Sequence, residues 1–151
     1  MRAVIQRVQH ASVVVEGATV GEIQQGLLVL LGIAPADTAA DIERLVKKIT
    51  SLRIFSDAEG KMNHSVADIQ GEILVISQFT LFADTQKGNR PSYMRAAAPA
   101  VAVPLYENFL AALRAQFSGK IAEGIFGADM KVSLLNDGPV TIWLDSQQPS
   151  Y

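Results

Sequence analysis

The first part of the chain alternates apolar and polar residues in the manner of β-strands. Apolar side chains recur at roughly every second position over residues 3–15, and the turn signal Glu16-Gly17 separates this segment from residues 19–23. Residues 27–33 have no polar face, which predicts a strand that is buried on both sides. The pattern therefore predicts three strands here, the third of them buried on both sides.

Two later segments have a helical period instead. One apolar stripe has the spacing of a helix and consists of Ile42, Leu45, Val46, Ile49 and Leu52. Thr38 precedes this stripe as a candidate N-cap, with Asp41 three residues later. A second helix is predicted at about residues 99–117, where proline suits the first turn and Gly119 suits the stop.

The remaining segments complete an α+β pattern. Strands are predicted at residues 73–79, 130–135 and 140–144, and loops at residues 55–63 and 82–98. The second loop is long, and such loops in compact domains are often functional. We expect one domain over residues 1–151, a curved, barrel-like antiparallel or mixed β-sheet with two main helices, ending in a loose tail at residues 146–151.

Composition narrows the classes of function. Hydrophobic residues make up 49% and charged residues 19% of the 151, which indicates a compact globular protein. The absence of cysteine excludes disulfides, thiol catalysis and cysteine-ligated zinc. A net charge of −2 gives no overall basic field for long nucleic acid, although a site for one RNA end is compatible with it.

Targeting and cofactor signals are missing as well. Arg2 and Arg7 interrupt the N-terminal segment, and the apolar run at residues 27–35 is too short to cross a bilayer, so we expect a soluble cytoplasmic protein without a membrane partner. The two histidines lie far apart, and neither a P-loop nor a dinucleotide fingerprint is present. We therefore expect no metal and no cofactor.

Polar residues follow the apolar strand at residues 72–76. Ser77, Gln78, Phe79 and Thr80 place hydrogen-bonding groups where packing alone would not require them. A nucleophilic Ser77 or Thr80 would need a base, and no histidine stands in a recognisable triad spacing. The two hydroxyls either bond loop backbone, as is usual at strand ends, or help to form an oxyanion hole with main-chain N–H groups. We favour the second interpretation.

Three other groups of residues have both an ordinary and a functional interpretation. Gly138-Pro139, beside the strand at 140–144, is by spacing an ordinary hairpin turn, yet such a pair can also adopt a cis peptide and present two carbonyls. Phe126 and Met130 are by default core residues. Lys87, Asn89 and Arg90 are either a solvated loop or contacts to RNA phosphate.

Taken together, these segments resemble the D-aminoacyl-tRNA deacylase family. The matching stretches are residues 1–8, 26–32, 77–81, 87–92, 126–130 and 136–141. Each stretch alone is a weak signal, but all of them occur in the family's order in a chain of the family's size. The resemblance covers essentially the whole chain, to about Asp145.

The resemblance implies a homodimer with two active sites at its interface. Gly138-Pro139 would be cis and would reach the partner's site, where its carbonyls exclude an L side chain but admit a D side chain or glycine. Arg7 would support this segment instead of being a solvated charge. Phe126 and Met130 would form the pocket for the terminal adenine.

The implied activity is translation quality control at the 3′ end of aminoacyl-tRNA. The family hydrolyses the ester of D-aminoacyl-tRNA, and of glycine mischarged onto alanine tRNA, with help from the 2′-hydroxyl of the terminal ribose. Thr80 would then position the ester together with Ser77, Gln78 and Phe79. Two alternatives stay open: an esterase acylated on Thr80 or Ser77, and a non-catalytic module that binds nucleic-acid ends.

Overall fold

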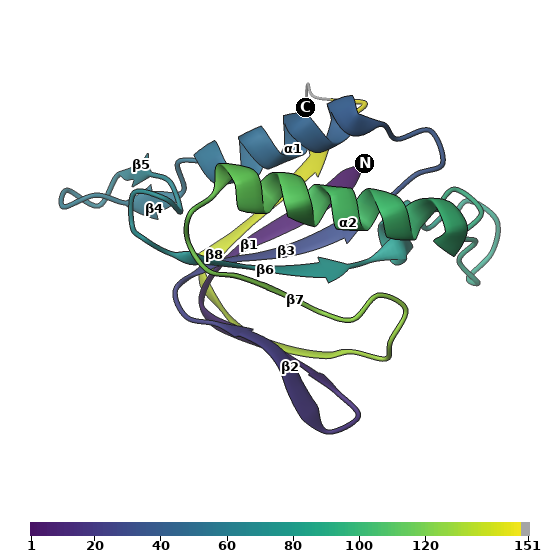
Figure 1. The fold of residues 1–151 in the computed structure, drawn as a ribbon, viewed down its shortest axis with the longest axis horizontal. Helices are drawn as coiled ribbons and strands as arrows, with labels where there is room; N and C mark the ends of the chain where they lie inside the picture. Colours follow the sequence, from purple (N-terminus) through teal and green to yellow (C-terminus); the bar gives the residue numbers. More distant parts are fainter. Residues whose placement is uncertain (149–151) are drawn as a thin grey trace.

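The computed structural model describes residues 1–148 and arranges them around one long strand. This strand, β1 (Arg2–Val15), pairs antiparallel along one edge with β8 (Lys131–Asp145). Its other edge pairs antiparallel with β3 (Gly26–Gly32) and then with β2 (Ala18–Ile23). Figure 1 shows β1 in the middle of this arrangement.

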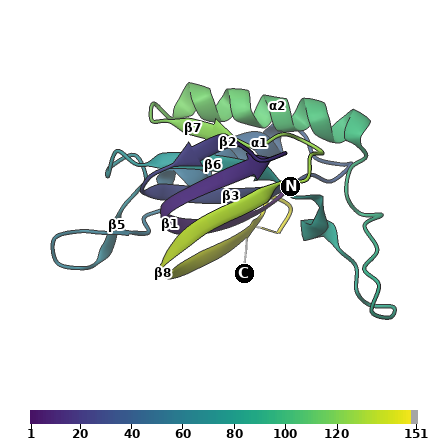
Figure 2. The same cartoon turned by 90° about the horizontal axis from the view of Figure 1, so that it is seen from below.

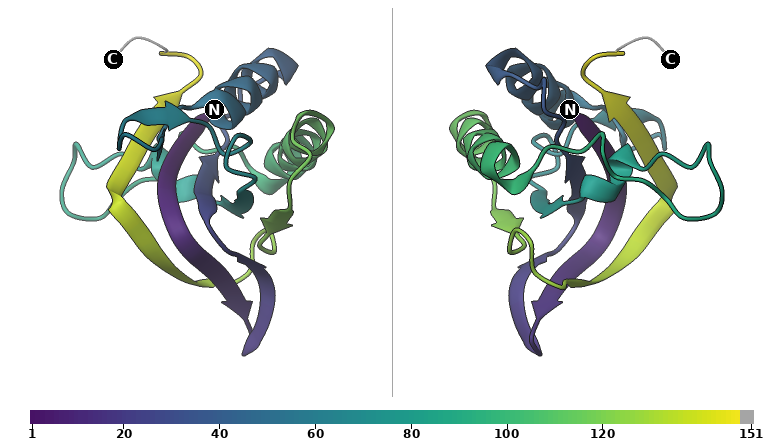
Figure 3. Two further views of the ribbon diagram at one scale, coloured as in Figure 1. Left: turned by 90° about the vertical axis from the view of Figure 1, so that its left-hand side faces the viewer. Right: turned by 90° about the vertical axis from the view of Figure 1, so that its right-hand side faces the viewer.

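Two parallel pairings extend the sheet and make it mixed. β6 (Glu72–Ser77) pairs with β3, and the short strand β7 (Ile121–Glu123) pairs with β6. β7 also approaches β2, since a Cβ at Gly21 would lie 2.7 Å from the Glu123 carbonyl oxygen. The sheet therefore nearly closes on itself, and the curl is visible in both views of Figure 3. The predicted α+β fold with a barrel-like sheet is confirmed.

Both predicted helices are present and lie over the same face of the sheet (Figure 1). α1 (Ala39–Ser51) begins after Thr38, whose backbone N–H donates to Asp41 Oδ2 at 2.8 Å. α2 (Pro99–Gln116) has Pro99 in its first turn, whereas Pro104 lies inside the helix.

Two apolar cores occupy the two faces of the sheet, because successive side chains of a strand point to opposite sides. Leu27, Val29, Ile73 and Val75 face the helices and pack in the larger core. Leu28, Leu74 and Ile76 instead point into the curl of the sheet, where they meet Val8 and Val13. β3 is thus buried on both sides, as its sequence predicts.

Several expected boundaries differ from the structure. The expected loop at residues 55–63 contains a short hairpin, β4 (Phe55–Ser56) with β5 (Met62–His64). The strand predicted at residues 73–79 ends at Ser77 and is followed by a 3₁₀ turn, η1 (Phe79–Phe82). The loop after η1 projects from the body of the domain, at the right of Figure 2.

Ser146 and Gln147 are held more firmly than the sequence predicts. Ser146, expected in a loose tail, is 1% exposed, and its backbone N–H donates to the Met1 carbonyl at 2.9 Å. The side chain of Gln147 donates to Asp41 at 2.8 Å. The expectation therefore does not hold for these two residues, and residues 149–151 lie outside the described part of the chain.

Within residues 1–148, no helix combines the length and the apolar character that crossing a membrane requires.

Candidate active site

A cavity of about 270 Å³ opens where β6 ends, between the sheet and the beginning of α2. Its walls are mostly apolar, with polar groups at the strand end. The lining residues are Leu31, Ile33, Ile76, Ser77, Gln78, Phe79, Ala97, Ala102, Phe126, Gly127, Ala128, Asp129, Met130 and Val132. An apolar cavity with a few convergent polar groups is the usual form of a small-molecule or cofactor site.

The polar wall is fixed by the close approach of η1 to β3. The backbone N–H of Gln78 donates to the Leu31 carbonyl at 2.7 Å, which extends the strand pairing by one step. Gly32 permits this approach, because a Cβ there would lie 3.0 Å from the Gln78 carbonyl oxygen. The chain then turns at once, so that Ser77, Gln78 and Phe79 face the cavity.

Thr80 lies in the same turn but does not line the cavity itself. Its hydroxyl accepts a hydrogen bond from the side-chain amide of Gln78. His10 and His64 do not line the cavity either. Neither histidine therefore shares the cavity with Ser77 as a possible base.

The opposite wall contains the aromatic and thioether groups singled out in the sequence. Phe126 packs against Tyr106 with ring centroids 5.7 Å apart. Met130 packs on Gly124, where a Cβ would lie 2.5 Å from the Met130 sulfur. Tyr106 is anchored in turn, since its hydroxyl donates to the Val75 carbonyl at 3.2 Å and burial raises its pKa. These contacts hold Phe126 and Met130 in the cavity wall, and an aromatic ring and a thioether are suitable groups for packing on a flat base.

Gly138-Pro139 lies away from this cavity, within β8. The peptide bond between the two residues is cis. The hairpin interpretation is wrong, because the two strands expected on either side of the pair form one continuous strand against β1. The pairing shifts register on both sides of Val8: β8 has the extra residues between Gln6 and Val8, where Gly138-Pro139 lies, and β1 has the extra residue between Val8 and Ala11. Asn136 closes the bulge by donating to the carbonyls of Arg7 at 3.0 Å and Val140 at 3.1 Å.

Arg7 contacts the residue before the Gly138-Pro139 pair. Its Nε donates to the Asp137 carbonyl at 3.0 Å, and its Nη1 donates to the Ile54 carbonyl at 2.6 Å. The guanidinium also lies 3.5 Å from the Asp137 carboxylate. The supporting role of Arg7 stays a prediction, but the contacts that such a role requires are present.

Lys87, Asn89 and Arg90 belong neither to the cavity lining nor to the Gly138-Pro139 segment. All three are exposed in the loop that η1 begins, and none of them bonds to another described residue. Backbone hydrogen bonds of 2.8 and 2.9 Å between Asp84 and Ser92 close the base of this loop.

Some lining residues were not foreseen from the sequence. Ile33, Ala97, Ala102 and Val132 all contribute to the cavity. The small side chains of the two alanines leave space that larger residues would fill. The run of alanines at residues 96–98 was the available signal, although such a run by itself does not indicate a cavity.

The chain is similar in sequence or in fold to several other proteins. A D-aminoacyl-tRNA deacylase of Flavobacterium johnsoniae is 60% identical over 147 residues, which cover 97% of this chain and 98% of the relative. That of Chloroflexus aurantiacus is 58% identical over 98% of this chain and 92% of the relative. The solved structure described as "c-Myc DNA Unwinding Element Binding Protein" has a TM-score of 0.91 at 46% identity, covering 96% of this chain and 98% of that one.

A more distant structure shares the fold alone. The "probable eukaryotic D-amino acid tRNA deacylase" has a TM-score of 0.79 at 18% identity and covers 95% of this chain and 97% of that one. The family profile described as "D-Tyr-tRNA(Tyr) deacylase" matches residues 4–145. With the full-length identity to the bacterial relatives, this match shows that the chain belongs to the D-Tyr-tRNA(Tyr) deacylase family.

Proposed function

We propose that this protein is a proofreading hydrolase that cleaves the ester of D-aminoacyl-tRNA in the cavity beside η1 and spares L-aminoacyl-tRNA. Membership of the family supports the reaction class, an ester hydrolysis on D-aminoacyl-tRNA. The observation that carries the selectivity is the position of Gly138-Pro139. Arg7 holds this segment at the surface, away from the cavity of its own chain. It therefore acts in the cavity of a second copy, and the working unit is a homodimer.

The two walls of the cavity bind different parts of the substrate. The terminal adenine stacks on the wall of Phe126 and Met130, and the ester carbonyl lies toward Ser77 and η1. The first N–H groups of a helical turn have no partner within that turn, so the amides of Phe79 and Thr80 are suited to bind a developing oxyanion. Lys87, Asn89 and Arg90 contact the phosphates that lead away from the terminal nucleotide.

The chemistry is assisted by the RNA. No histidine lines the cavity, Thr80 accepts a hydrogen bond from Gln78, and the carboxylate of Asp129 in the lining is ion-paired with Lys131, so none of these groups is free to serve as a base for a water molecule. The 2′-hydroxyl of the terminal ribose supplies this help, while the protein positions an ester that is already activated. Glycine has no side chain to be excluded, so glycyl-tRNA(Ala) is a second substrate.

The first experiment compares hydrolysis of D-tyrosyl-tRNA, L-tyrosyl-tRNA and glycyl-tRNA(Ala) by the full-length protein. We expect rapid loss of the D-ester and the glycyl ester, and survival of the L-ester. Equal hydrolysis of the D and L esters would contradict the selectivity. A tRNA that ends in 2′-deoxyadenosine tests the RNA-assisted step, and an undiminished rate on that substrate would overturn it.

The alternatives give different outcomes in the same assay. An esterase acylated on Thr80 or Ser77 retains activity on the 2′-deoxy substrate and yields a covalent acyl adduct by mass spectrometry. A module that only binds nucleic-acid ends hydrolyses none of the esters. The name of the 46% identical structure, a DNA-element binding protein, is the observation that keeps this second alternative under test.

Mixed dimers test the proposed exchange between subunits. One parent carries Phe126→Ala, which damages the adenine wall, and the other carries Gly138→Ala, which displaces the selecting segment. If the segment serves the partner, a mixed dimer contains one cavity in which both elements are intact, and part of the selective activity returns. If each segment serves its own chain, both cavities stay damaged and mixing restores nothing.

A further inference from the structure

An exposed aromatic pair lies at the edge of the cavity. Phe79 lines the cavity and is nevertheless 56% exposed, which places this residue at the boundary between the cavity and solvent. Tyr93 packs on Phe79 with ring centroids 5.0 Å apart and is itself 39% exposed. Exposed apolar side chains that are grouped, and not scattered singly, indicate a surface that a ligand or partner covers.

The geometry of the pair suits a flat ligand. The planes of the two rings are 77° apart, so the edge of one ring meets a face of the other. This contact uses only one of the four ring faces. A nucleobase can stack on a free aromatic face, and such stacking is tolerant of the identity of the base. The pair is therefore suited to hold a base outside the adenine wall.

The backbone around Tyr93 is fixed within the protein itself. The two backbone hydrogen bonds between Asp84 and Ser92 close the projecting loop directly before Tyr93. Arg95 lies 3.0 Å from the Asp84 carboxylate, and the Tyr93 carbonyl accepts the Ala96 N–H at 3.0 Å. A group that is held in advance loses little conformational entropy when a ligand binds.

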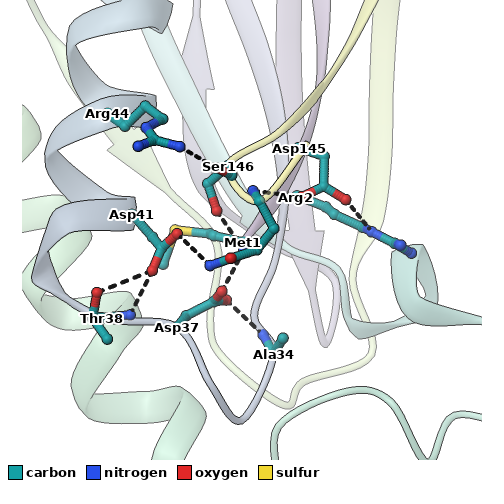
Figure 4. Close-up of polar contacts among 10 residues, drawn as sticks. Met1, Arg2, Ala34, Asp37, Thr38, Asp41, Arg44, Asp145 and Ser146 are labelled. Carbon is teal, nitrogen blue, oxygen red and sulfur yellow. Dashed lines mark hydrogen bonds and ion pairs between the residues drawn. The ribbon is translucent and has the colours of Figure 1, made fainter. Parts of the chain in front are cut away.

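The turn that carries Phe79 is fixed from its other end. Arg2 Nη1 donates to the Leu81 carbonyl in η1 at 2.9 Å, and the guanidinium lies 4.5 Å from the centre of the Phe82 ring. The Nε of Arg2 donates in turn to Asp145 at 2.9 Å, as Figure 4 shows. Both rings of the aromatic pair therefore belong to anchored segments.

The pair lies between the two parts of the molecule that are suited to an RNA end. On one side is the cavity, whose wall contains Phe126 and Met130. On the other side is the projecting loop (Figure 2), where Lys87 and Arg90 are exposed. A strand whose terminal adenine occupies the cavity, and whose phosphates reach the loop, has to pass the aromatic pair. The nucleotide next to the terminal adenosine is the first to meet it.

We propose that Phe79 and Tyr93 form a second base subsite, which stacks the base of the nucleotide that precedes the terminal adenosine. In tRNA this base is cytosine whatever the amino acid, so the subsite adds affinity without selecting a particular tRNA. The inference rests on the proposed function, because it takes the RNA end as the ligand of the cavity.

The test compares two minimal substrates, the D-tyrosyl ester of adenosine and the same ester of the dinucleotide cytidylyl-adenosine. For the full-length wild type, kcat/KM should be about tenfold higher on the dinucleotide, mainly through a lower KM, as for one stacked base. In Tyr93→Ala this advantage should fall to about twofold, whereas Tyr93→Phe keeps the ring and should keep the advantage. An advantage that is unchanged in Tyr93→Ala would overturn the proposal.

An abasic dinucleotide separates stacking from charge. It keeps the ribose and the phosphate that precede the adenosine ester but lacks the cytosine, and we expect the wild type to lose most of the tenfold advantage on it. An abasic substrate as good as the complete dinucleotide would assign the advantage to phosphate contacts and would overturn the subsite. Met94→Ala, an exposed neighbour outside the aromatic pair, is the matched control and should keep the wild-type ratio. An equal loss in Met94→Ala would also contradict the assignment to the pair.

A binding measurement distinguishes failure of this inference from failure of the proposed function. Amide analogues of the two esters are not hydrolysed, and titration calorimetry gives their Kd values for each variant. We expect the dinucleotide analogue to bind about tenfold more tightly to wild type and to lose most of this gain in Tyr93→Ala. Hydrolysis of the esters together with an unchanged Kd ratio in Tyr93→Ala would remove the subsite and leave the deacylase proposal standing. A ratio that falls as expected, without hydrolysis of any ester, would support the subsite and contradict the proposed reaction.

Discussion

The side-chain amide of Gln78 donates a hydrogen bond to the hydroxyl oxygen of Thr80. This bond occupies an acceptor site on the hydroxyl and leaves its proton available to donate. A nucleophilic hydroxyl needs the opposite arrangement, in which a base accepts its proton. The pair is therefore suited to orienting a substrate oxygen, and the hydroxyl is not prepared for attack.

Replacing Thr80 should consequently weaken catalysis without abolishing it. Thr80→Ala removes about one hydrogen bond, which corresponds to roughly a tenfold loss in kcat/KM on D-tyrosyl-tRNA. Thr80→Ser keeps the hydroxyl and should recover most of that loss. Single-turnover kinetics measure both variants. Complete inactivity of Thr80→Ala, together with an acyl adduct on wild-type Thr80, would instead establish a nucleophile.

A methyl group at Gly138 should disturb the selecting segment. Gly138 has a φ of +131°, and a Cβ there would lie 2.9 Å from the Val140 side chain and 3.0 Å from Arg7 Nη2. Gly138→Ala therefore has to displace the segment, and we expect the ratio of D-ester to L-ester hydrolysis to fall about tenfold or more. Gly60→Ala is the matched control, because Gly60 has a φ of +79° with no neighbour within 4 Å of a Cβ. An unchanged ratio in Gly138→Ala would contradict the role of this segment.

Periodic patterns in the sequence correctly predicted the strand that is buried on both faces and the helix with one apolar face. The run at residues 27–33 predicts the buried β3, and the stripe from Ile42 to Leu52 predicts α1, because burial on fixed faces imposes those periods. The strand-end residues Ser77, Gln78 and Phe79 line the cavity, as do Phe126 and Met130. For Ser77 to Phe79, the informative signal was the occurrence of polar residues directly after an apolar strand.

Features that depend on distant segments could not be predicted in this way. Gly138-Pro139 has the local signature of a hairpin, yet long-range pairing with β1 keeps β8 continuous through it. Ser77 ends β6 because η1 packs on Gly32, a contact that no local pattern indicates. The ion pair between Met1 and Asp37 joins residues far apart in the sequence, so neither charge alone reveals it.

The aromatic wall can be tested through substrate affinity. Phe126→Ala removes a ring that lines the cavity and packs on Tyr106. Because stacking on an aromatic ring contributes about 1–3 kcal/mol per base, we expect KM for D-tyrosyl-tRNA to rise about tenfold or more, with a smaller change in kcat. Ile125→Ala, an exposed neighbour outside the lining, should leave both constants unchanged. A loss confined to kcat would place Phe126 in the chemical step and not in adenine binding.

Acid should weaken the N-terminal end of α1 through Asp41. Burial alone would raise the pKa of this carboxyl, but hydrogen bonds from Ser146 and Thr38 outweigh burial, and its pKa lies below the ordinary value. A carboxyl with a lowered pKa stabilises the fold above its unfolded pKa of about 4, and this contribution disappears as the pH falls through the folded pKa.

Asp41→Asn should therefore lower the Tm by about 2–4 °C at pH 7, and its difference from wild type should shrink as the pH falls below about 4. Thermal unfolding followed by circular dichroism at several pH values measures this difference. Glu43→Gln, on the exposed part of the same helix, controls for the loss of a surface carboxylate. A difference that stays constant down to pH 2 would show that the charge of Asp41 contributes nothing to stability.

The projecting loop should contribute binding energy that depends on salt. Lys87 and Arg90 are exposed and bond to no other described residue, so their charges are available to the phosphates of a bound RNA. The double variant Lys87→Ala/Arg90→Ala should reduce the slope of log affinity against log salt by about 1.4, since each of two neutralised phosphates contributes roughly 0.7 on a single strand. Lys47→Ala/Lys48→Ala removes the same charge from α1 and should leave the slope unchanged. Equal slopes for all three proteins would show that the loop does not contact the RNA backbone.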